Sequence, residues 1–423
     1  MTTSMGFHTF TILKRLTYSE AIQLYRDFQE YRQKTDEIRV RPLEKSAARN
    51  YQTYPDAYII EYIDGGRGIT WQIRFCDKIS QFCAMSLNYR SANYLQEPRA
   101  YSIRAVINPK VFTGIRDYLS AANEACIEEL EDCFNAEASL ISAVLGEFEE
   151  YSLTRVDYCV NFDLGELGFP CSAKQLIALI KRSDVPKHFK VWTEYDKKSH
   201  RRKSNKAALY LSNKSVTINC YWKYAHLKKE YPDCEDLEAS REVVRFEVQC
   251  KYAKVYPMAR VIRDMMRHDL SWEKLMDGSF FEEINPTQEM LSNWFSARII
   301  RSYFQKIVGK GDYLTLDAAR WMVERCGFQH RKQERLIWTL ELVNECRGIA
   351  AAKSKVKTVD ADEFKRSLKE LNAMLINPVT IPRDWGIEHI TNPLRAYYNY
   401  VTEEQLVGTD ERRFWRYFGE YLG

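Results

Sequence analysis

One short stretch of the chain, residues 217–224, carries side chains whose types and spacing suit chemistry. If it forms a β-strand, its side chains alternate between the two faces of a sheet. One face is then apolar and suited to a core, with Ile218, Cys220, Trp222 and Tyr224. The other face carries Thr217, Asn219, Tyr221 and Lys223. A tyrosine and a lysine therefore point the same way from a sheet whose back is buried, and Tyr221 is a candidate nucleophile.

Two other predicted strands have the same division into an apolar and a polar face. The strand near residues 153–163 offers Arg155 and Asp157, and the strand near residues 242–250 offers Arg245 and Glu247. A half-solvated antiparallel sheet with cross-strand charge pairs, each worth about 0.2–1 kcal/mol, would explain any one of these strands. Three such strands grouped in one block favour a chemical site instead.

The residue types on this face suit phosphoryl transfer. Asp157 and Glu247 could hold Mg²⁺ or Mn²⁺ through carboxylate oxygens. Arg155, Lys223 or Arg245 could neutralise the charge that grows on a phosphate. A tyrosine has an ordinary pKa of about 10, so its hydroxyl needs a neighbouring cation or metal to act as a nucleophile.

The other tyrosines of this block are poorer candidates for the nucleophile. Tyr224 and Tyr158 fall on apolar faces, where a ring is expected to pack. Tyr210 lies on the preceding strand and has no flanking cation. The pattern therefore predicts Tyr221 as the attacking residue.

A basic segment precedes the strand of Tyr221. The segment from Lys187 to Lys214 contains nine Lys or Arg residues and two acids, Glu194 and Asp196, so its local charge is +7. A solvated run of charge is the plainer interpretation, whereas contact with backbone phosphates is the functional one. The candidate DNA-binding residues in it are Lys197, Lys198, Arg201, Arg202, Lys203 and Lys206.

Composition limits the classes of protein to consider. A chain of 423 residues predicts two or three domains, and a net charge of +4 is too small to indicate a polyanion partner by itself. The eleven cysteines include no Cys-x-x-Cys pair, which favours reduced thiols over a disulfide framework. No long apolar run is present, so we expect a cytoplasmic protein without a membrane partner.

At these motifs the sequence resembles rolling-circle replication initiators, of the filamentous-phage gene II type and the plasmid and conjugative-element type often called Rep_trans. The similarity covers about residues 55–265 in order and spacing. Its motifs are Thr154–Asp157, Tyr221–Lys223, Val244–Glu247 and, before a helix, Asn108–Val111.

The resemblance implies an enzyme that nicks one DNA strand at an origin through a tyrosine, leaving a 5′-phosphotyrosine and a free 3′-OH. It also implies a divalent metal, origin DNA that is single-stranded or hairpin at the nick site, and a host helicase or polymerase as partner. Two alternatives stay open: a non-catalytic protein that binds the origin or single-stranded DNA with the same sheet, and a conjugative relaxase of the same family.

The sequence departs from related families at the metal site. Related relaxases carry a His-hydrophobic-His motif, which none of the seven histidines here forms. In Rep_trans proteins a second Asp often follows the first by four positions, where this chain has Asn161 and then Asp163. Glu194 and Asp196 are candidate substitutes.

The predicted fold is α+β, an antiparallel-sheet nicking domain followed by a helical C-terminal domain. The predicted parts are residues 1–150, an N-terminal α+β part; 151–268, the catalytic sheet; and 269–423, helical. Both of the first two blocks run strand, helix, then antiparallel strands, which suggests a duplicated unit although no residue-level repeat is visible.

Local signals predict further elements. Thr17 and Glu20 form a capping-box pattern that opens a helix to about Tyr31, and Ser172 caps another. Residues 35–55 have the composition of a loop, and helices are predicted near 111–134 and 138–150. Residues 315–326 and 331–345 suit either a helix-turn-helix or plain helical packing, and the basic residues 412–416 suit either DNA contact or a solvated helix face.

Overall fold

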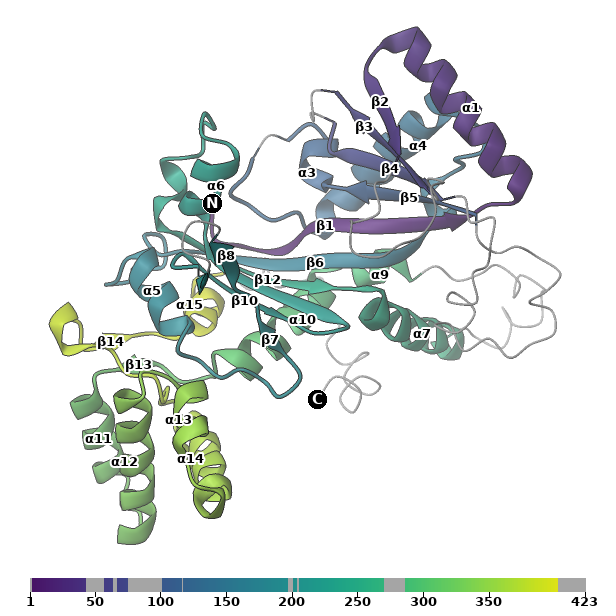
Figure 1. The fold of residues 1–423 in the computed structure, drawn as a ribbon. Helices are drawn as coiled ribbons and strands as arrows, with labels where there is room; N and C mark the ends of the chain where they lie inside the picture. Colours follow the sequence, from purple (N-terminus) through teal and green to yellow (C-terminus); the bar gives the residue numbers. More distant parts are fainter. Residues whose placement is uncertain are drawn as a thin grey trace.

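The computed structural model describes residues 2–42, 57–63, 67–74, 101–115, 117–196, 201–203, 205–269 and 286–401. Within them the chain forms one large antiparallel sheet with helices against it, followed by a group of C-terminal helices (Figure 1). The α+β class predicted from the sequence is confirmed.

The sheet has ten strands in the order β2-β3-β4-β5-β1-β6-β12-β11-β10-β7. Every neighbouring pair in it is antiparallel. The strands are β1 (Ser4–Arg15), β2 (Ile38–Pro42), β3 (Ala57–Tyr62), β4 (Ile69–Arg74), β5 (Ser102–Ile107), β6 (Ser152–Asp163), β7 (Lys190–Val191), β10 (Ala208–Ser212), β11 (Val216–Trp222) and β12 (Val243–Cys250).

The two blocks of the chain form two halves of this sheet with the same topology. Outward from the centre, one half reads β1, β5, β4, β3, β2 and the other reads β6, β12, β11, β10, β7. Each half begins with its central strand, followed by a helix, α1 (Tyr18–Thr35) or α5 (Ala173–Ile180). The structure therefore supports the duplicated unit suggested by the sequence.

The pairing of β1 with β6 gives the register of this duplication. Phe10 pairs with Val156 at the centre, and the pairs on either side repeat each other: Thr9 with Asp157 and Thr11 with Arg155, Phe7 with Tyr158 and Ile12 with Leu153, Gly6 with Cys159 and Leu13 with Ser152. The pairing skips His8 on β1 and Thr154 on β6, so each strand has an irregularity at the equivalent place. A local two-fold axis through the Phe10–Val156 pair relates the halves and keeps their faces on the same sides.

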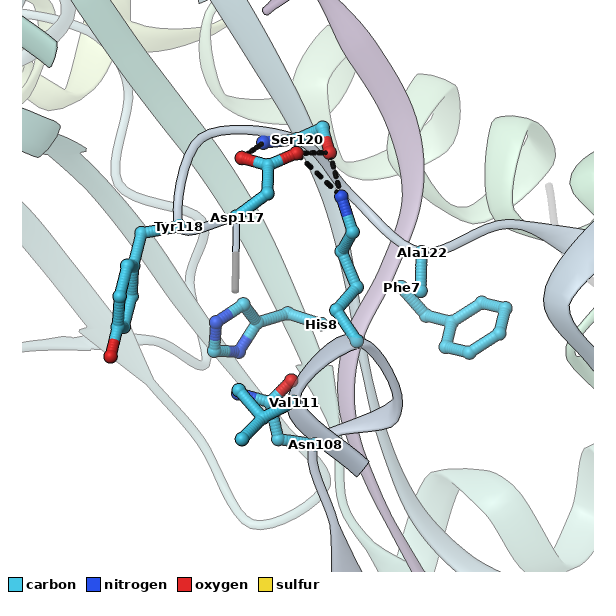
Figure 2. A pocket seen from close by; sticks show the side chains of 9 residues that line it. Phe7, His8, Asn108, Val111, Asp117, Tyr118, Ser120 and Ala122 are labelled. Atoms are coloured by element: carbon cyan, nitrogen blue, oxygen red, sulfur yellow. Dashed lines mark hydrogen bonds and ion pairs between the residues drawn. The ribbon is translucent and has the colours of Figure 1, made fainter. Parts of the chain in front are cut away.

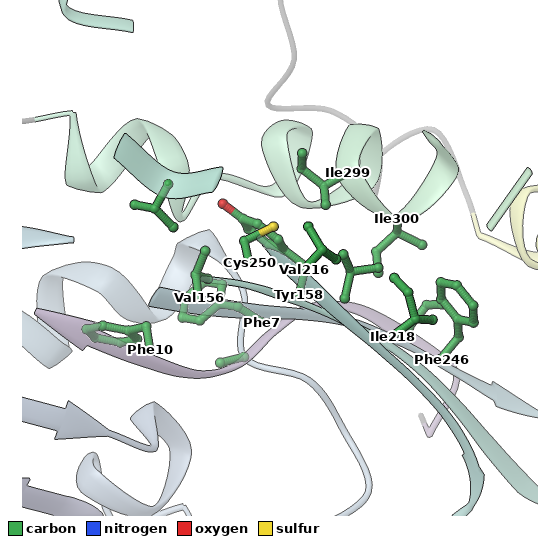
Figure 3. Close-up of a cluster of buried hydrophobic side chains, with 14 of the residues drawn as sticks. Phe7, Phe10, Val156, Tyr158, Val216, Ile218, Phe246, Cys250, Ile299 and Ile300 are labelled. Atoms are coloured by element: carbon green, nitrogen blue, oxygen red, sulfur yellow. The ribbon is translucent and has the colours of Figure 1, made fainter. Parts of the chain in front are cut away.

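One face of the sheet is buried under helices and forms the main core. Figure 3 shows side chains of β1, β6, β11 and β12 meeting Ile299 and Ile300 of α10 (Asn293–Ile307). In the other half, Trp71 of β4 packs against Phe28 of α1 and Phe134 of α4 (Ile127–Ile141). Alternation therefore works as predicted, and Val156, Tyr158, Val160 and Phe162 are all fully buried.

The remaining elements cover the ends of the sheet and continue the chain. β8 (Glu194–Asp196) and β9 (Arg201–Lys203) form a separate two-stranded sheet, and β13 (Tyr313–Leu314) and β14 (His389–Ile390) form another. The other helices are α3 (Pro109–Phe112), α6 (Lys223–Glu230), α7 (Tyr252–Asp269), α9 (Thr287–Met290), α11 (Leu316–Arg325), α12 (His330–Glu345), α13 (Ile349–Lys355), α14 (Ala361–Ala373) and α15 (Pro393–Tyr400). Of the helices described, none is both long and apolar enough to span a membrane.

The C-terminal helices form a second, smaller core. Helices α11, α12 and α14 enclose Ala319, Val323, Leu336, Leu340 and Leu371. Both helices predicted for a helix-turn-helix exist, and α12 packs against α14 by its apolar side. Trp338 on α12 is 37% exposed. Residues 412–416 lie outside the described residues.

Three local predictions need correction. Residues 38–42, expected as part of a loop, form β2, because Ile38 and Val40 alternate with arginines. The predicted helix over 111–134 is mostly loop: α3 ends at Phe112 and α4 starts at Ile127. Helix α4 also continues through the gap between the predicted helices 111–134 and 138–150, because Phe134 and Ala138 belong to one buried stripe.

The capping predictions are confirmed. Thr17 and Glu20 form a complete capping box at the start of α1, and that helix extends to Thr35. Ser172 caps α5 in the same way with Gln175. These local hydrogen bonds satisfy backbone N–H groups that the first turn of a helix leaves unpaired.

Replacing Phe304 tests whether α10 belongs to the core of the sheet. Its ring is fully buried and lies 5.8 Å from Phe162 and 5.1 Å from Phe246, centroid to centroid. We expect Phe304→Ala to lower the free energy of unfolding by about 3–5 kcal/mol, measured by urea denaturation. Val359→Ala, at a site 84% exposed, should change it by less than about 0.5 kcal/mol. Equal small effects would contradict this packing.

Candidate active site

The polar face of the second half-sheet brings the predicted residues together. Tyr221 on β11 is paired with Arg245 on β12, and Arg245 is paired with Asn161 on β6. Two residues further along β12, Glu247 is paired with Asn219 on β11 and with Cys159 on β6. Directly paired residues share a face, so these side chains form one continuous group.

Arg245 is the centre of this group. Its side chain is fully buried, and its Nε donates a 2.7 Å hydrogen bond to Oδ1 of Asn161. Neither terminal nitrogen of Arg245 has a hydrogen-bond partner in the part of the chain that the structure describes. A buried guanidinium with two unused donor groups is suited to hold an anion such as a phosphate.

Tyr221 lies against Arg245 but is enclosed, with only 8% of its surface exposed. Burial raises the pKa of its phenol, while the charge of Arg245 acts in the opposite direction. The ring of His226, on α6, lies 5.2 Å from the Tyr221 ring. The hydroxyl is therefore protonated in this arrangement, and a substrate could reach it only if the covering segments moved.

Lys223 also belongs to the group, although the strand ends sooner than predicted. β11 stops at Trp222, and Lys223 is the first residue of α6, with 2% of its surface exposed. Burial, followed by the charge of Arg245, lowers the pKa of Lys223 to about 7. The ammonium group thus titrates near neutral pH, unlike an ordinary lysine.

The same change of structure corrects the placement of Tyr224. Instead of sharing the core face of β11 with Ile218 and Cys220, it lies in the first turn of α6. There the guanidinium of Arg241 sits 4.7 Å above its ring, and the Trp222 ring is 5.1 Å away. In the sequence, apolar and polar residues go on alternating past residue 222, so nothing there indicated that the strand ends and a helix begins.

The two predicted carboxylates lie on the neighbouring strands β6 and β12. Burial raises the pKa of Asp157 to about 6; Arg155 opposes that shift and the charge of Glu247 adds to it. Both carboxylate oxygens of Asp157 accept hydrogen bonds from Arg155, at 3.0 Å from Nε and at a short distance from Nη2. Glu247 accepts a 2.9 Å hydrogen bond from Asn219.

This donor set fits a hard divalent cation in part. The described residues contain no group of three or more His, Cys, Asp or Glu side chains that could hold a metal. Mg²⁺, however, is usually bound by one or two carboxylates together with water and substrate phosphates. Asp157 and Glu247 therefore meet the minimum requirement, and the remaining ligands would have to be oxygens that the chain does not supply.

Three other predicted acids lie away from the paired positions of this group. Asp163 lies at the end of β6 and accepts a 3.0 Å hydrogen bond from the backbone N–H of Gly165. Glu194 and Asp196 belong to β8, in a two-stranded sheet separate from the strands of Asp157 and Glu247.

Part of the basic segment forms a β-strand. Arg201, Arg202 and Lys203 form β9, which pairs with β8. Lys206 is exposed, and Lys197 and Lys198 lie outside the described residues. Contact with nucleic acid at these positions stays a prediction.

A loop that follows β5, residues 117–122, contacts the polar face of the second half at Asn161. Asn161 donates a hydrogen bond to the carbonyl of Leu119, and Phe7 exchanges backbone hydrogen bonds with Ala122. A pocket lies beside this loop, and in Figure 2 the ring of His8 lies among its lining side chains. Lys110, which also lines the pocket, forms an ion pair with Asp117 at 2.6 Å.

The sequence pattern missed the two histidines of the site. Burial, then the charges of Arg245 and Lys223, lowers the pKa of His8, so it is neutral. His8 is skipped by the pairing of β1, which means that simple alternation does not give the direction of its side chain. His226 follows the unexpected helix start, so only a correct end for β11 would have placed it beside Tyr221.

No family model and no curated protein matches this chain in sequence. Among solved structures, it is similar to a rolling circle replication initiator protein from Geobacillus stearothermophilus, with 10% sequence identity. The alignment covers 68% of this chain and 90% of that chain, with a TM-score of 0.29. A TM-score this low carries no conclusion about the fold or activity of this chain.

Lys223 gives the site a measurable dependence of stability on pH. Its pKa is about 7 in the folded protein against an ordinary 10.5. Between these values the unfolded chain binds more protons, so stability rises with pH, by at most about 1.4 kcal/mol per pH unit from this residue. Below pH 7 both states are charged and the slope disappears.

We therefore expect Lys223→Met to remove this slope and to stabilise the protein most at pH 6, measured by urea unfolding at pH 6, 8 and 9. Lys229→Met on the same helix, with a side chain 79% exposed, serves as the matched control and should keep the slope. A wild-type slope in Lys223→Met would contradict burial of the charged lysine.

Proposed function

We propose that this protein is a DNA strand transferase in which Tyr221 attacks a phosphodiester to initiate rolling-circle replication. The observation that carries the proposal is the single polar group in which Tyr221 lies beside Arg245, with Lys223 and the carboxylates of Asp157 and Glu247 nearby. Three of the motifs that resemble the initiators contain these residues. They lie on the neighbouring strands β6, β12 and β11, with Lys223 following β11 as the first residue of α6.

The chemistry assigns a role to each side chain. The phenol oxygen of Tyr221 forms a bond to phosphorus, the bond to the 3′ oxygen breaks, and the 3′ oxygen takes a proton to become a hydroxyl. The terminal nitrogens of Arg245, which have no partner among the described residues, neutralise charge on the phosphate. Neutral Lys223, with a pKa of about 7, accepts the phenol proton.

Asp157 and Glu247 would hold the divalent cation. When bound, Mg²⁺ or Mn²⁺ would supply electrostatic stabilisation of the phosphate oxygens. Neutralising the repulsion between the two carboxylates, which contributes to the raised pKa of Asp157, would favour such binding.

The enclosure of Tyr221 favours a second candidate function. A tyrosine that is 8% exposed, with a pKa raised by burial, also suits a protein that binds DNA without cutting it. In that protein the polar group would position backbone phosphates and the tyrosine would only pack. Formation of a covalent adduct separates the two functions.

Tyr221→Phe should abolish the adduct and leave the fold intact. The 5′-phosphotyrosine retains the DNA fragment on the 3′ side of the cut, so the substrate is a random-sequence single-stranded 40-mer labelled at its 3′ end. We expect wild-type protein with Mn²⁺ to give a labelled band on a denaturing gel and Tyr221→Phe to give none. Tyr210→Phe on the neighbouring strand and Tyr224→Phe are matched controls and should keep the band.

A labelled adduct of normal yield from Tyr221→Phe would reject this tyrosine, and mass spectrometry of the linked peptide would then identify the residue that attacks. Wild-type protein that binds the oligonucleotide but never forms an adduct would support the non-catalytic function.

The carboxylates should be needed for cutting and not for binding. We expect Asp157→Asn and Glu247→Gln each to lower the rate of adduct formation by at least about 100-fold, with oligonucleotide affinity retained. Asp163→Asn, at the end of the same strand as Asp157, is the control and should cut normally. Full activity of both variants, or of wild-type protein in excess EDTA, would rule out the metal-dependent mechanism.

A further inference from the structure

The first half of the sheet contains a counterpart of the candidate active site. Around the local axis, the pair of Leu13 with Ser152 repeats the pair of Gly6 with Cys159, so Leu13 occupies the position of Cys159. Leu13 is paired with Arg104 on β5, as Cys159 is paired with Glu247 on β12. Arg104 thus occupies the place of a proposed metal-binding carboxylate.

The position of the candidate nucleophile is also taken by an arginine. Ser102 lies two residues before Arg104 on β5 and is paired with Arg74 on β4. In the other half Arg245, two residues before Glu247, is paired with Tyr221. Arg74 on β4 therefore stands where Tyr221 on β11 stands in the second half.

A third arginine completes this group. Arg15 on β1 is also paired with Ser102, so Arg15 and Arg74 flank that serine on the same face. Thr11 takes the place of Asp157. The equivalent positions of the first half thus hold arginines and no carboxylate; we name Arg15, Arg74 and Arg104 the arginine triad.

The arginine triad lacks counter-charges within the described residues. The Nε atoms of Arg74 and Arg104 are buried and have no hydrogen-bond partner there. Burial, then the charge of Arg74, lowers the pKa of Arg104 to about 10. Glu61, the acid on this face of β3, is bound 2.9 Å from Arg41.

Like charges at partly buried positions destabilise each other unless an anion binds between them. We propose that the arginine triad binds a backbone phosphate of a nucleic-acid strand, as a non-catalytic contact on the same face of the sheet as Tyr221. Guanidinium groups are well matched to phosphate because they can donate two parallel hydrogen bonds. The identity of the anion as a nucleic-acid phosphate rests on the proposed function.

A DNA-binding measurement tests the proposal and does not require the DNA to be cut. Fluorescein-labelled single-stranded dT30 is titrated with wild-type protein and with the Arg74→Gln/Arg104→Gln double variant at several salt concentrations. Each phosphate contact to a single strand contributes about 0.7 to the log–log salt slope. We expect the double variant to bind several-fold more weakly and to lower that slope by about 0.7, the value for one phosphate contact.

Two controls separate this contact from a structural effect. Arg26→Gln, on the exposed side of α1, should leave affinity and slope unchanged. Arg74→Lys/Arg104→Lys keeps both charges and should recover most of the salt slope. Because the arginines repel each other, the glutamine double variant should unfold at the same or a higher temperature than wild type.

The outcomes distinguish this inference from the proposed function. An unchanged salt slope in the glutamine double variant would overturn the phosphate site even if Tyr221 forms an adduct. A lowered slope, in a protein that never forms an adduct, would support the phosphate site and count against strand transfer. A large fall in unfolding temperature would instead show that the triad neutralises acids of this chain, which would also overturn the inference.

Discussion

The antiparallel pairing of β1 with β6 is the interaction on which the rest of the molecule depends. It joins two five-stranded halves into one sheet, with their apolar faces on the same side. Because that surface is continuous, α10 contacts β1, β6 and β12 together. The polar surfaces are continuous for the same reason, so a loop that follows β5 in the first half can reach Asn161 in the second half.

Burial of charge explains the properties of the candidate site. The side chains of Arg245 and Lys223 have little access to water. The same burial shifts the pKa values of Lys223, Asp157 and Tyr221 in the direction that favours the neutral form of each. Such an arrangement is costly for stability unless charges offset one another. Groups with shifted pKa values in one place are characteristic of sites that transfer protons or bind charged ligands.

Much of the fold could be predicted because its signals are local. The alternation of Val156, Tyr158 and Val160 gave β6 its buried face, and the capping residues Thr17 and Ser172 gave the starts of two helices. The end of β11 could not be predicted, because Lys223 and Tyr224 continue the alternation and the helix start has no side-chain cap.

Contacts between distant segments were equally hidden. The direction of the His8 side chain depends on an irregularity in the pairing with β6. Tyr221 lies beside His226 of α6, and a loop around Leu119 reaches Asn161. The equivalence of Arg74 and Tyr221 becomes visible only from the strand register, since the two halves share topology and not residue types.

The central position of β1 has a consequence for synthesis of the chain. One edge of β1 pairs with β5. Its other edge can pair only after β6, which begins at Ser152, has been synthesised. At about 5–20 residues per second a ribosome takes on the order of ten seconds to supply that partner. During this time the nascent first half exposes an unpaired strand edge and an apolar surface that α10 will later bury, so this is the stage at which a chaperone would be of most use.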